Sequence, residues 1–157
     1  MCSSDLAVVG HVEWVSFLAV DALPAAGRIG HASAFLEEPA GGGAVVAVQL
    51  ARLLGRPVPF FTALGRDAIG EQAVERLSAL GLELHVAWRD APTRRGVSFV
   101  DGAGDRSITV IGERLTPTAA DSLPWAELAA CDGVFATAAD AAALRACRAA
   151  KIGRAHV

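Results

Sequence analysis

Residues 44–88 read AVVAVQLARLLGRPVPFFTALGRDAIGEQAVERLSALGLELHVAW, a stretch in which helical and strand patterns alternate. It predicts a helix over 44–54, a buried strand over 57–64, a second helix over 66–80 and a short strand over 83–88. The apolar stripe of the second helix consists of Ile69, Ala73, Val74, Leu77 and Leu80. Because helices alternate with strands, the stretch predicts a parallel sheet covered by helices.

The flanking sequence continues this alternation, with two exceptions. We expect a strand over 7–20, a short helix over 124–130, a buried strand over 132–137 and a helix over 139–150. The exceptions are a partly alternating segment at 29–37 and two adjacent β-type segments, 96–101 and 106–111. These exceptions predict strands that do not belong to the central sheet.

The stretch Val100–Val110 reads VDGAGDRSITV and allows two interpretations. Two glycines followed by Asp105 would be typical of a phosphate-cradling loop that ends in a catalytic base, if the loop opened a helix. Residues 107–111 are instead of β type, and glycines between two strands are typical of a hairpin. We therefore predict a hairpin and do not assign Asp105 as a catalytic residue.

The composition argues against several classes of protein. The chain has 157 residues, 53% of them hydrophobic, and a formal net charge of −3, which suits one domain with a core. It has no Lys/Arg run that would favour nucleic acid or an anionic membrane as partner, no apolar run of the roughly 18–20 residues of a membrane span and no secretory signal. Its cysteines are scattered, and no histidine stands at metal-ligand spacing from them. We expect a cytoplasmic protein and no metal site.

Both ends of the chain look like sequencing-adapter read-through. One short DNA string encodes the opening MCSSDL, with GTG as start codon, and its reverse complement encodes KIGRAH near the other end. Such segments are excluded from reasoning about the fold. We expect residues 1–6 and 151–157 to be non-native and residues 7–150 to be an interior piece of a longer gene.

Three consecutive glycines, Gly41, Gly42 and Gly43, precede the first helix of the opening stretch. Bare backbone and free N–H groups at a helix start let a polar ligand approach the positive end of the helix dipole. The glycines fit a simple strand-to-helix turn equally well. They form neither a Rossmann fingerprint, which needs a third spaced glycine, nor a Walker A loop, which ends in Gly-Lys-Ser/Thr.

Glu13 is a carboxylate inside an otherwise apolar strand, near the carboxyl end of that strand. Ligands of open α/β sheets bind at the carboxyl ends of strands, and we favour a binding role over a solvated strand face. We expect His11 to be partly buried and satisfied by hydrogen bonds. Asp67 is expected to cap the helix that follows it, and Glu38 to be a solvated charge.

The order of these motifs resembles the N-terminal half of the PfkB/ribokinase family of carbohydrate kinases. The matching segments are VVGHVEW (8–14), LPAAGRIGHA (23–32), PAGGGAVVAVQLARLLG (39–55), FFTALGRDAIGEQAVERLSALGLEL (60–84) and PTRRGVSFVDGAGDRSITV (92–110). The third resembles the family's Gly-Gly-Lys-Gly-Ala-Asn signature, and the fourth its Gly-x-Asp-x-x-Gly stretch. The likeness covers residues 7–150.

The resemblance implies a truncated, ribokinase-like α/β fold, in which helices flank a Rossmann-like parallel sheet and a small β-sheet lid is added. The lid segments would be about 11–38 and 94–112, and in some members the lids of two subunits form a homodimer. The family's catalytic Asp, in a Gly-Ala-Gly-Asp motif, and most of its ATP site lie in the C-terminal half, which would follow residue 150. ATP and Mg²⁺ are the implied cofactors of the full-length protein.

The sequence also departs from the family pattern. Many members have Asn and Asp in the first strand where this chain has Glu13 and Val15. The Lys and Asn of the glycine signature are Gly43 and Val46 here. Since polar contacts discriminate between substrates, we expect a substrate other than ribose, with Glu13 contacting one hydroxyl.

On this resemblance, the full-length protein phosphorylates a sugar or sugar-like alcohol with ATP. This chain would carry the substrate-binding residues Glu13, Gly41, Gly42 and Gly43 together with the lid, and it would be inactive alone. Two alternatives stay open. One is a binding module that holds a small polyol without chemistry, and the other is an inert truncated product with exposed sheet edges.

Overall fold

The computed structural model describes residues 5–151 of the chain. The expected non-native residues 1–4 and 152–157 lie outside this range. Asp5 precedes the first strand, Leu6 begins it, and Lys151 ends the last helix. None of the described helices has the length and the apolar character needed to cross a membrane.

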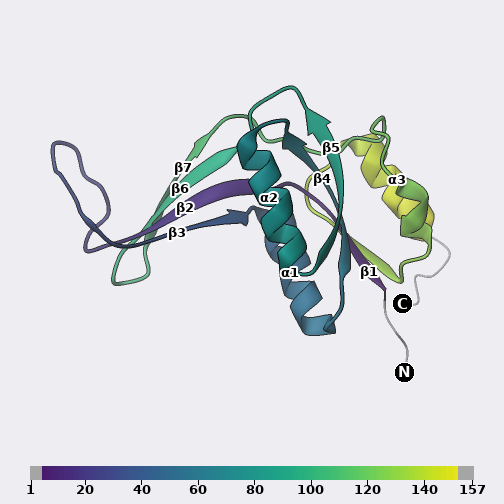
Figure 1. Cartoon of the computed structure of the whole chain (residues 1–157), viewed down its shortest axis with the longest axis horizontal. Coiled ribbons are helices and arrows are strands. Elements are labelled where there is room, and N and C mark those ends of the chain that lie inside the picture. Colours follow the sequence, from purple (N-terminus) through teal and green to yellow (C-terminus); the bar gives the residue numbers. More distant parts are fainter. Residues whose placement is uncertain (1–4, 152–157) are drawn as a thin grey trace.

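A parallel four-stranded sheet forms the body of the molecule, in the order β5-β4-β1-β8. Its strands are β1 (Leu6–Val9), β4 (Val58–Gly65), β5 (Leu82–Arg89) and β8 (Gly133–Ala136). One face carries α1 (Gly42–Leu54) and α2 (Ala68–Ala79); the other carries the 3₁₀ helix η1 (Trp125–Ala129) and α3 (Ala141–Lys151) (Figure 1). The predicted parallel sheet with helical cover is confirmed.

The strand β4 explains why the sheet has a core on both faces. Phe60 and Leu64 pack with Val8 in the cluster beneath α1 and α2. Phe61 points to the opposite face, where it packs with Val9 and Leu128. A parallel strand buried on both faces reads as a continuous apolar run rather than an alternating one, as residues 58–64 do.

A second four-stranded sheet, in the order β3-β2-β6-β7, extends to one side of the body (Figure 1). Its strands are β2 (Glu13–Val20), β3 (Ala32–Ala40), β6 (Arg95–Val100) and β7 (Arg106–Ile111). The strand β2 is antiparallel to β3 and parallel to β6, and β6 is antiparallel to β7. These strands occupy the segments expected to leave the central sheet, although β3 runs past residue 38 to Ala40.

The prediction of one strand over 7–20 is wrong, because the chain leaves the first sheet within it. β1 ends at Val9, and β2 begins at Glu13 in the second sheet. β1 pairs with β4 and β8, whereas β2 pairs with β3 and β6. A run of β-type residues predicts extended backbone but not which partners each half will find.

The predicted hairpin is confirmed by the pairing of Val100 with Arg106. The Asp101 carboxylate closes its tip, because Oδ1 accepts hydrogen bonds from Ala103 N at 2.9 Å and Asp105 N at 3.0 Å. Asp105 itself is exposed at the tip. Its backbone takes part in the turn, and no helix follows whose amides would hold a phosphoryl group.

Candidate functional site

The carboxyl end of β1 and the start of α1 touch backbone to backbone. A Cβ on Gly43 would lie 2.8 Å from Gly10 Cα and from His11 N, and a Cβ on Gly10 would lie 2.7 Å from Gly43 Cα. Gly41, the N-cap of α1, has a φ of 90°, which disfavours any residue with a Cβ. The turn interpretation therefore accounts for Gly41 and Gly43.

Gly42 differs from its two neighbours because it is exposed. No side chain of the described residues caps the N-terminus of α1, so N–H groups of the first turn have no side-chain acceptor. Such a helix start attracts polar and anionic groups. Ligand binding by the glycine turn stays a prediction that this geometry permits.

Glu13 lies directly beside the glycine turn. A Cβ on Gly41 would lie 3.2 Å from Glu13 N and 3.1 Å from His11 Cδ2. The side chain of Glu13 is 14% exposed at the first residue of β2. Glu13 was expected inside a strand near its carboxyl end; it instead lies beyond the carboxyl end of β1 and starts β2. The structure brings all four predicted substrate-binding residues together.

Arg94 is a member of this cluster that sequence reasoning missed. Its Nε lies 3.0 Å from Glu13 Oε1, in an ion pair without the alignment of a hydrogen bond, and its side chain is 15% exposed. Its carbonyl oxygen accepts a hydrogen bond from Trp14 N at 2.9 Å, which fixes β2 beside this segment. In the sequence, only the adjacent residues Arg94 and Arg95 indicated a positive charge near this cluster. Because Arg95 is exposed, the pair alone does not tell which of the two arginines faces inward.

His11 completes the cluster as a buried neutral base. Burial lowers its pKa below the ordinary 6.5, and the positive charges of Arg114 and Arg94 lower it further against the opposing effect of Glu13. His11 Nε2 lies 3.6 Å from Glu13 Oε1, and His11 Nδ1 has no hydrogen-bond partner among the described residues. The expectation that His11 is satisfied by hydrogen bonds is wrong for Nδ1, because this buried atom has no partner among the described residues and the Glu13 carboxylate lies on the Nε2 side of the ring.

This buried imidazole makes a pH dependence of stability an expected result. With a folded pKa below the unfolded one, the unfolded chain binds the extra proton, so stability is complete above pH 6.5 and is lost as the pH falls through the folded pKa. The variant His11→Asn should flatten the change in urea midpoint between pH 7.5 and pH 5.5, and His31→Asn, on an exposed loop, should not. If the urea midpoint changes equally with pH in both variants, His11 is not the source of the pH dependence.

The Gly-x-Asp-x-x-Gly stretch holds the segment that leads to Arg94. Asp67 caps α2, as expected, because its Oδ1 accepts a hydrogen bond from Gly70 N at 2.7 Å. The same carboxylate accepts from Thr93 Oγ1 and from Thr93 N, each at 2.8 Å. Burial opposes ionisation of Asp67, but these hydrogen bonds outweigh it and lower its pKa. The motif therefore has a positioning role toward the cluster.

The structure also gives the surroundings of Val15, Val46 and Glu38. Val15 is buried, and Val46 packs against the core, so these positions present no group to the cluster. Glu38, expected to be solvated, accepts a hydrogen bond from Arg76 Nε at 2.8 Å, and this bond lowers its pKa. Pockets of about 260 and 230 Å³ are lined by other residues than Glu13 and the glycines.

Comparison with known proteins gives one family and many structures. The family model described as pfkB family carbohydrate kinase matches residues 3–153. Ribokinase from Thermotoga maritima is 25% identical with a TM-score of 0.66, over 83% of this chain and 44% of that one. Arabidopsis thaliana ribokinase complexed with ribose and ATP is 23% identical with a TM-score of 0.68, over 94% and 51%. Escherichia coli phosphofructokinase-2 in complex with fructose-6-phosphate is 21% identical with a TM-score of 0.60, over 73% and 37%.

The chain spans about half the length of the solved proteins that it matches. A search of curated proteins gave no match. The matched half contains the parallel sheet and the second sheet described above, and the ribokinase-like fold expected from the sequence is confirmed.

Proposed function

Because this chain belongs to the pfkB family of carbohydrate kinases, we propose that the full-length protein transfers a phosphoryl group from ATP to a hydroxyl of a sugar or sugar-like alcohol. The observation that carries the proposal is the contact of Glu13 with the glycine turn, at the strand end where parallel sheets bind ligands. The matched structures include kinases bound to two different sugars, so the fold alone does not name the substrate.

Glu13 and Arg94 form the polar part of the proposed substrate site. A carboxylate only accepts hydrogen bonds and a guanidinium only donates them, so the pair suits two neighbouring hydroxyl groups, one used as donor and one as acceptor. Because Val15 is buried and Val46 packs against the core, the site offers fewer polar groups than the family pattern. We therefore propose a substrate other than ribose.

The described residues around the glycine turn do not fit a magnesium–nucleotide site. Mg²⁺ is held by one or two carboxylates together with substrate phosphates, and Glu13 is already paired with Arg94. We therefore place ATP, Mg²⁺ and the catalytic base in the other half of the full-length protein. Bound there, ATP supplies the phosphoryl group and Mg²⁺ neutralises its charge.

The second sheet is the proposed lid and the proposed surface for a second copy of the chain. Large apolar side chains are more than 40% exposed on its strands: Phe35, Leu36, Ile108, Val110 and Ile111. Exposed apolar surface of this kind is typical of an interaction site. A homodimer through the lid and a cytoplasmic location belong to this proposal.

The proposal is tested on the longer protein, obtained by amplifying the source gene across codon 150. We expect an in-frame Gly-Ala-Gly-Asp that opens a helix, sugar phosphorylation by that protein and none by the 157-residue chain. Glu13→Gln should raise KM about 10- to 100-fold, the effect of removing a hydrogen bond to a charged group. Asp105→Asn, at the exposed hairpin tip, should leave kcat and KM unchanged.

The same experiment separates the two alternatives. Binding of a polyol to the longer protein without nucleotide dependence or turnover would favour a binding module. A broad, non-cooperative melt of the 157-residue chain would favour an inert truncated product. Loss of activity in Asp105→Asn would overturn the placement of the catalytic base.

A further inference from the structure

A second cluster of polar side chains lies at the amino end of the parallel sheet, away from the glycine turn. Glu83 and His85 occupy alternate positions near the start of β5, so their side chains share one face. Glu127 reaches the same place from η1. His85 Nε2 lies 3.4 Å from Glu127 Oε2 and 3.9 Å from Glu83 Oε1. One nitrogen or oxygen of each residue lies within 4.8 Å of those of the other two.

The imidazole of His85 is held in a fixed orientation. Its ring centroid lies 4.5 Å from that of the fully buried Phe61, which in turn stacks on Trp125 at 5.5 Å. His85 Nε2 is buried and has no hydrogen-bond partner among the described residues. A buried ring nitrogen without a partner is costly, and its lone pair is a good metal ligand.

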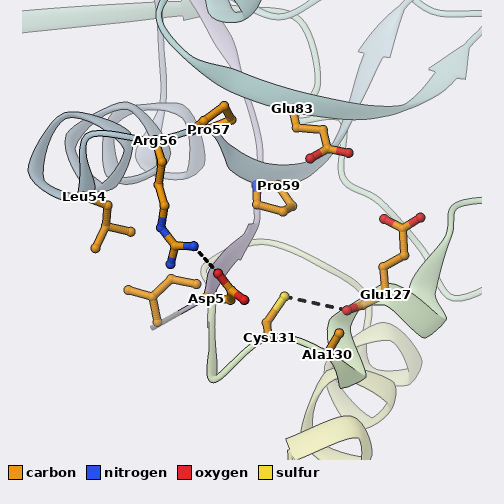
Figure 2. A pocket seen from close by; sticks show the side chains of 10 residues that line it. Asp5, Leu54, Arg56, Pro57, Pro59, Glu83, Glu127, Ala130 and Cys131 are labelled. Atoms are coloured by element: carbon orange, nitrogen blue, oxygen red, sulfur yellow. Dashed lines mark hydrogen bonds and ion pairs between the residues drawn. The ribbon is translucent and has the colours of Figure 1, made fainter. Parts of the chain in front are cut away.

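The two carboxylates differ from the imidazole because their side chains are exposed. The side chains of Glu83 and Glu127 are 59% and 56% exposed, and within residues 5–151 neither is paired with a lysine or arginine. Both line a pocket of about 260 Å³, where Figure 2 shows one extending from the strand and the other from η1. Two negative charges that meet at one histidine repel each other, and a divalent cation would remove that repulsion.

We propose that Glu83, His85 and Glu127 bind a zinc-class divalent cation, with water as the fourth ligand. Zn–N and Zn–O bonds of about 2.0–2.1 Å in a tetrahedron put ligand atoms roughly 3.4 Å apart. His85 Nε2 and Glu127 Oε2 already have this separation. The distance of 3.9 Å between His85 Nε2 and Glu83 Oε1 would shorten by rotation of the exposed Glu83 side chain. The imidazole selects Zn²⁺ over Mg²⁺ and Ca²⁺, which prefer oxygen ligands.

The position of this site indicates a structural role. The ion would join the edge strand β5 to η1, two segments that are far apart in the sequence and adjacent in space. The sheet fixes the backbone positions of Glu83 and His85 on β5, and η1 supplies Glu127. The expectation of no metal site rested on sequence spacing alone, and the proposal replaces it independently of the kinase function.

The test is calorimetric titration of Zn²⁺ into the 157-residue chain after removal of metals with EDTA. We expect one equivalent to bind, a higher melting temperature with Zn²⁺ and no binding of Mg²⁺. His85→Ala should abolish binding, and Glu83→Gln should weaken it at least about 10-fold. The matched controls are His31→Ala and Glu71→Gln, which change the same residue types outside the cluster and should bind Zn²⁺ like the unmodified chain.

The proposal is overturned if no Zn²⁺ binds at about 100 µM, or if both cluster variants bind as the unmodified chain does. The second result would assign binding to other groups, such as the cysteine thiols. Glu83 is exposed on an edge strand, so its variant keeps the test valid even where His85→Ala does not fold. Substitution by Co²⁺ should give the visible absorption of a four-coordinate site, and Glu83→Gln should lose that absorption.

Discussion

Gly43→Ala is expected to lower the free energy of unfolding by about 3 kcal/mol or more, at the upper end of the cost of overpacking. The new Cβ would lie 2.8 Å from Gly10 Cα, Gly10 C and His11 N. These are backbone atoms at the end of a central strand, so no side chain can rotate away. For a domain whose whole stability is about 5–15 kcal/mol, such a loss leaves a large unfolded fraction. Urea denaturation followed by tryptophan fluorescence measures it.

The matched control is Gly42→Ala, one residue earlier in the same turn. There the nearest atom to a new Cβ is Thr137 Oγ1 at 3.3 Å, and it belongs to a side chain that can move. We expect a change in unfolding free energy of less than about 1 kcal/mol. Equal urea midpoints for the two variants would mean that the contact between Gly43 and Gly10 is not a constraint of the fold.

Asp67→Ala is the second large effect, again about 3 kcal/mol. The substitution removes the N-cap of α2, worth about 1 kcal/mol. It also leaves Thr93 N, in a residue only 2% exposed, without its acceptor, and leaves Thr93 Oγ1 only the longer bond to Gly65 O at 3.5 Å. A buried unsatisfied donor costs about 1–3 kcal/mol. The comparison in urea is with Asp90→Ala, whose side chain is 97% exposed and whose distant pairing with Arg66 adds little.

The substitution Asp67→Asn separates the two contributions. Asparagine caps helices as well as aspartate does, but its amide nitrogen donates and would face one of the two Thr93 donors. We expect Asp67→Asn to fall between the wild-type chain and Asp67→Ala in stability. If instead it matches the wild-type chain, the bonds to Thr93 are not significant, and the Gly-x-Asp-x-x-Gly stretch is only a helix cap.

Features that depend on a few neighbouring residues were predictable from the chain alone. The alternation of helices and strands in residues 44–88, the cap at Asp67 and the hairpin around Gly102–Gly104 follow from side-chain period, hydrogen-bonding groups and backbone freedom within short windows. The order of the short motifs along the chain was also enough to indicate the family resemblance. The grouping of Glu13 with the glycines came from the family resemblance, whereas the general rule about strand ends indicated only a binding role for Glu13.

Features that depend on which distant segments meet were decided only by the tertiary structure. The split of residues 7–20 between two sheets reflects the different pairing partners of β1 and β2. Arg94 rather than Arg95 pairs with Glu13, directly after Thr93, which Asp67 holds by hydrogen bonds across the fold. Glu127 reaches His85 because η1 packs across the sheet. Burial and long-range contacts give these charges their partners, and neither quantity is present in a local sequence window.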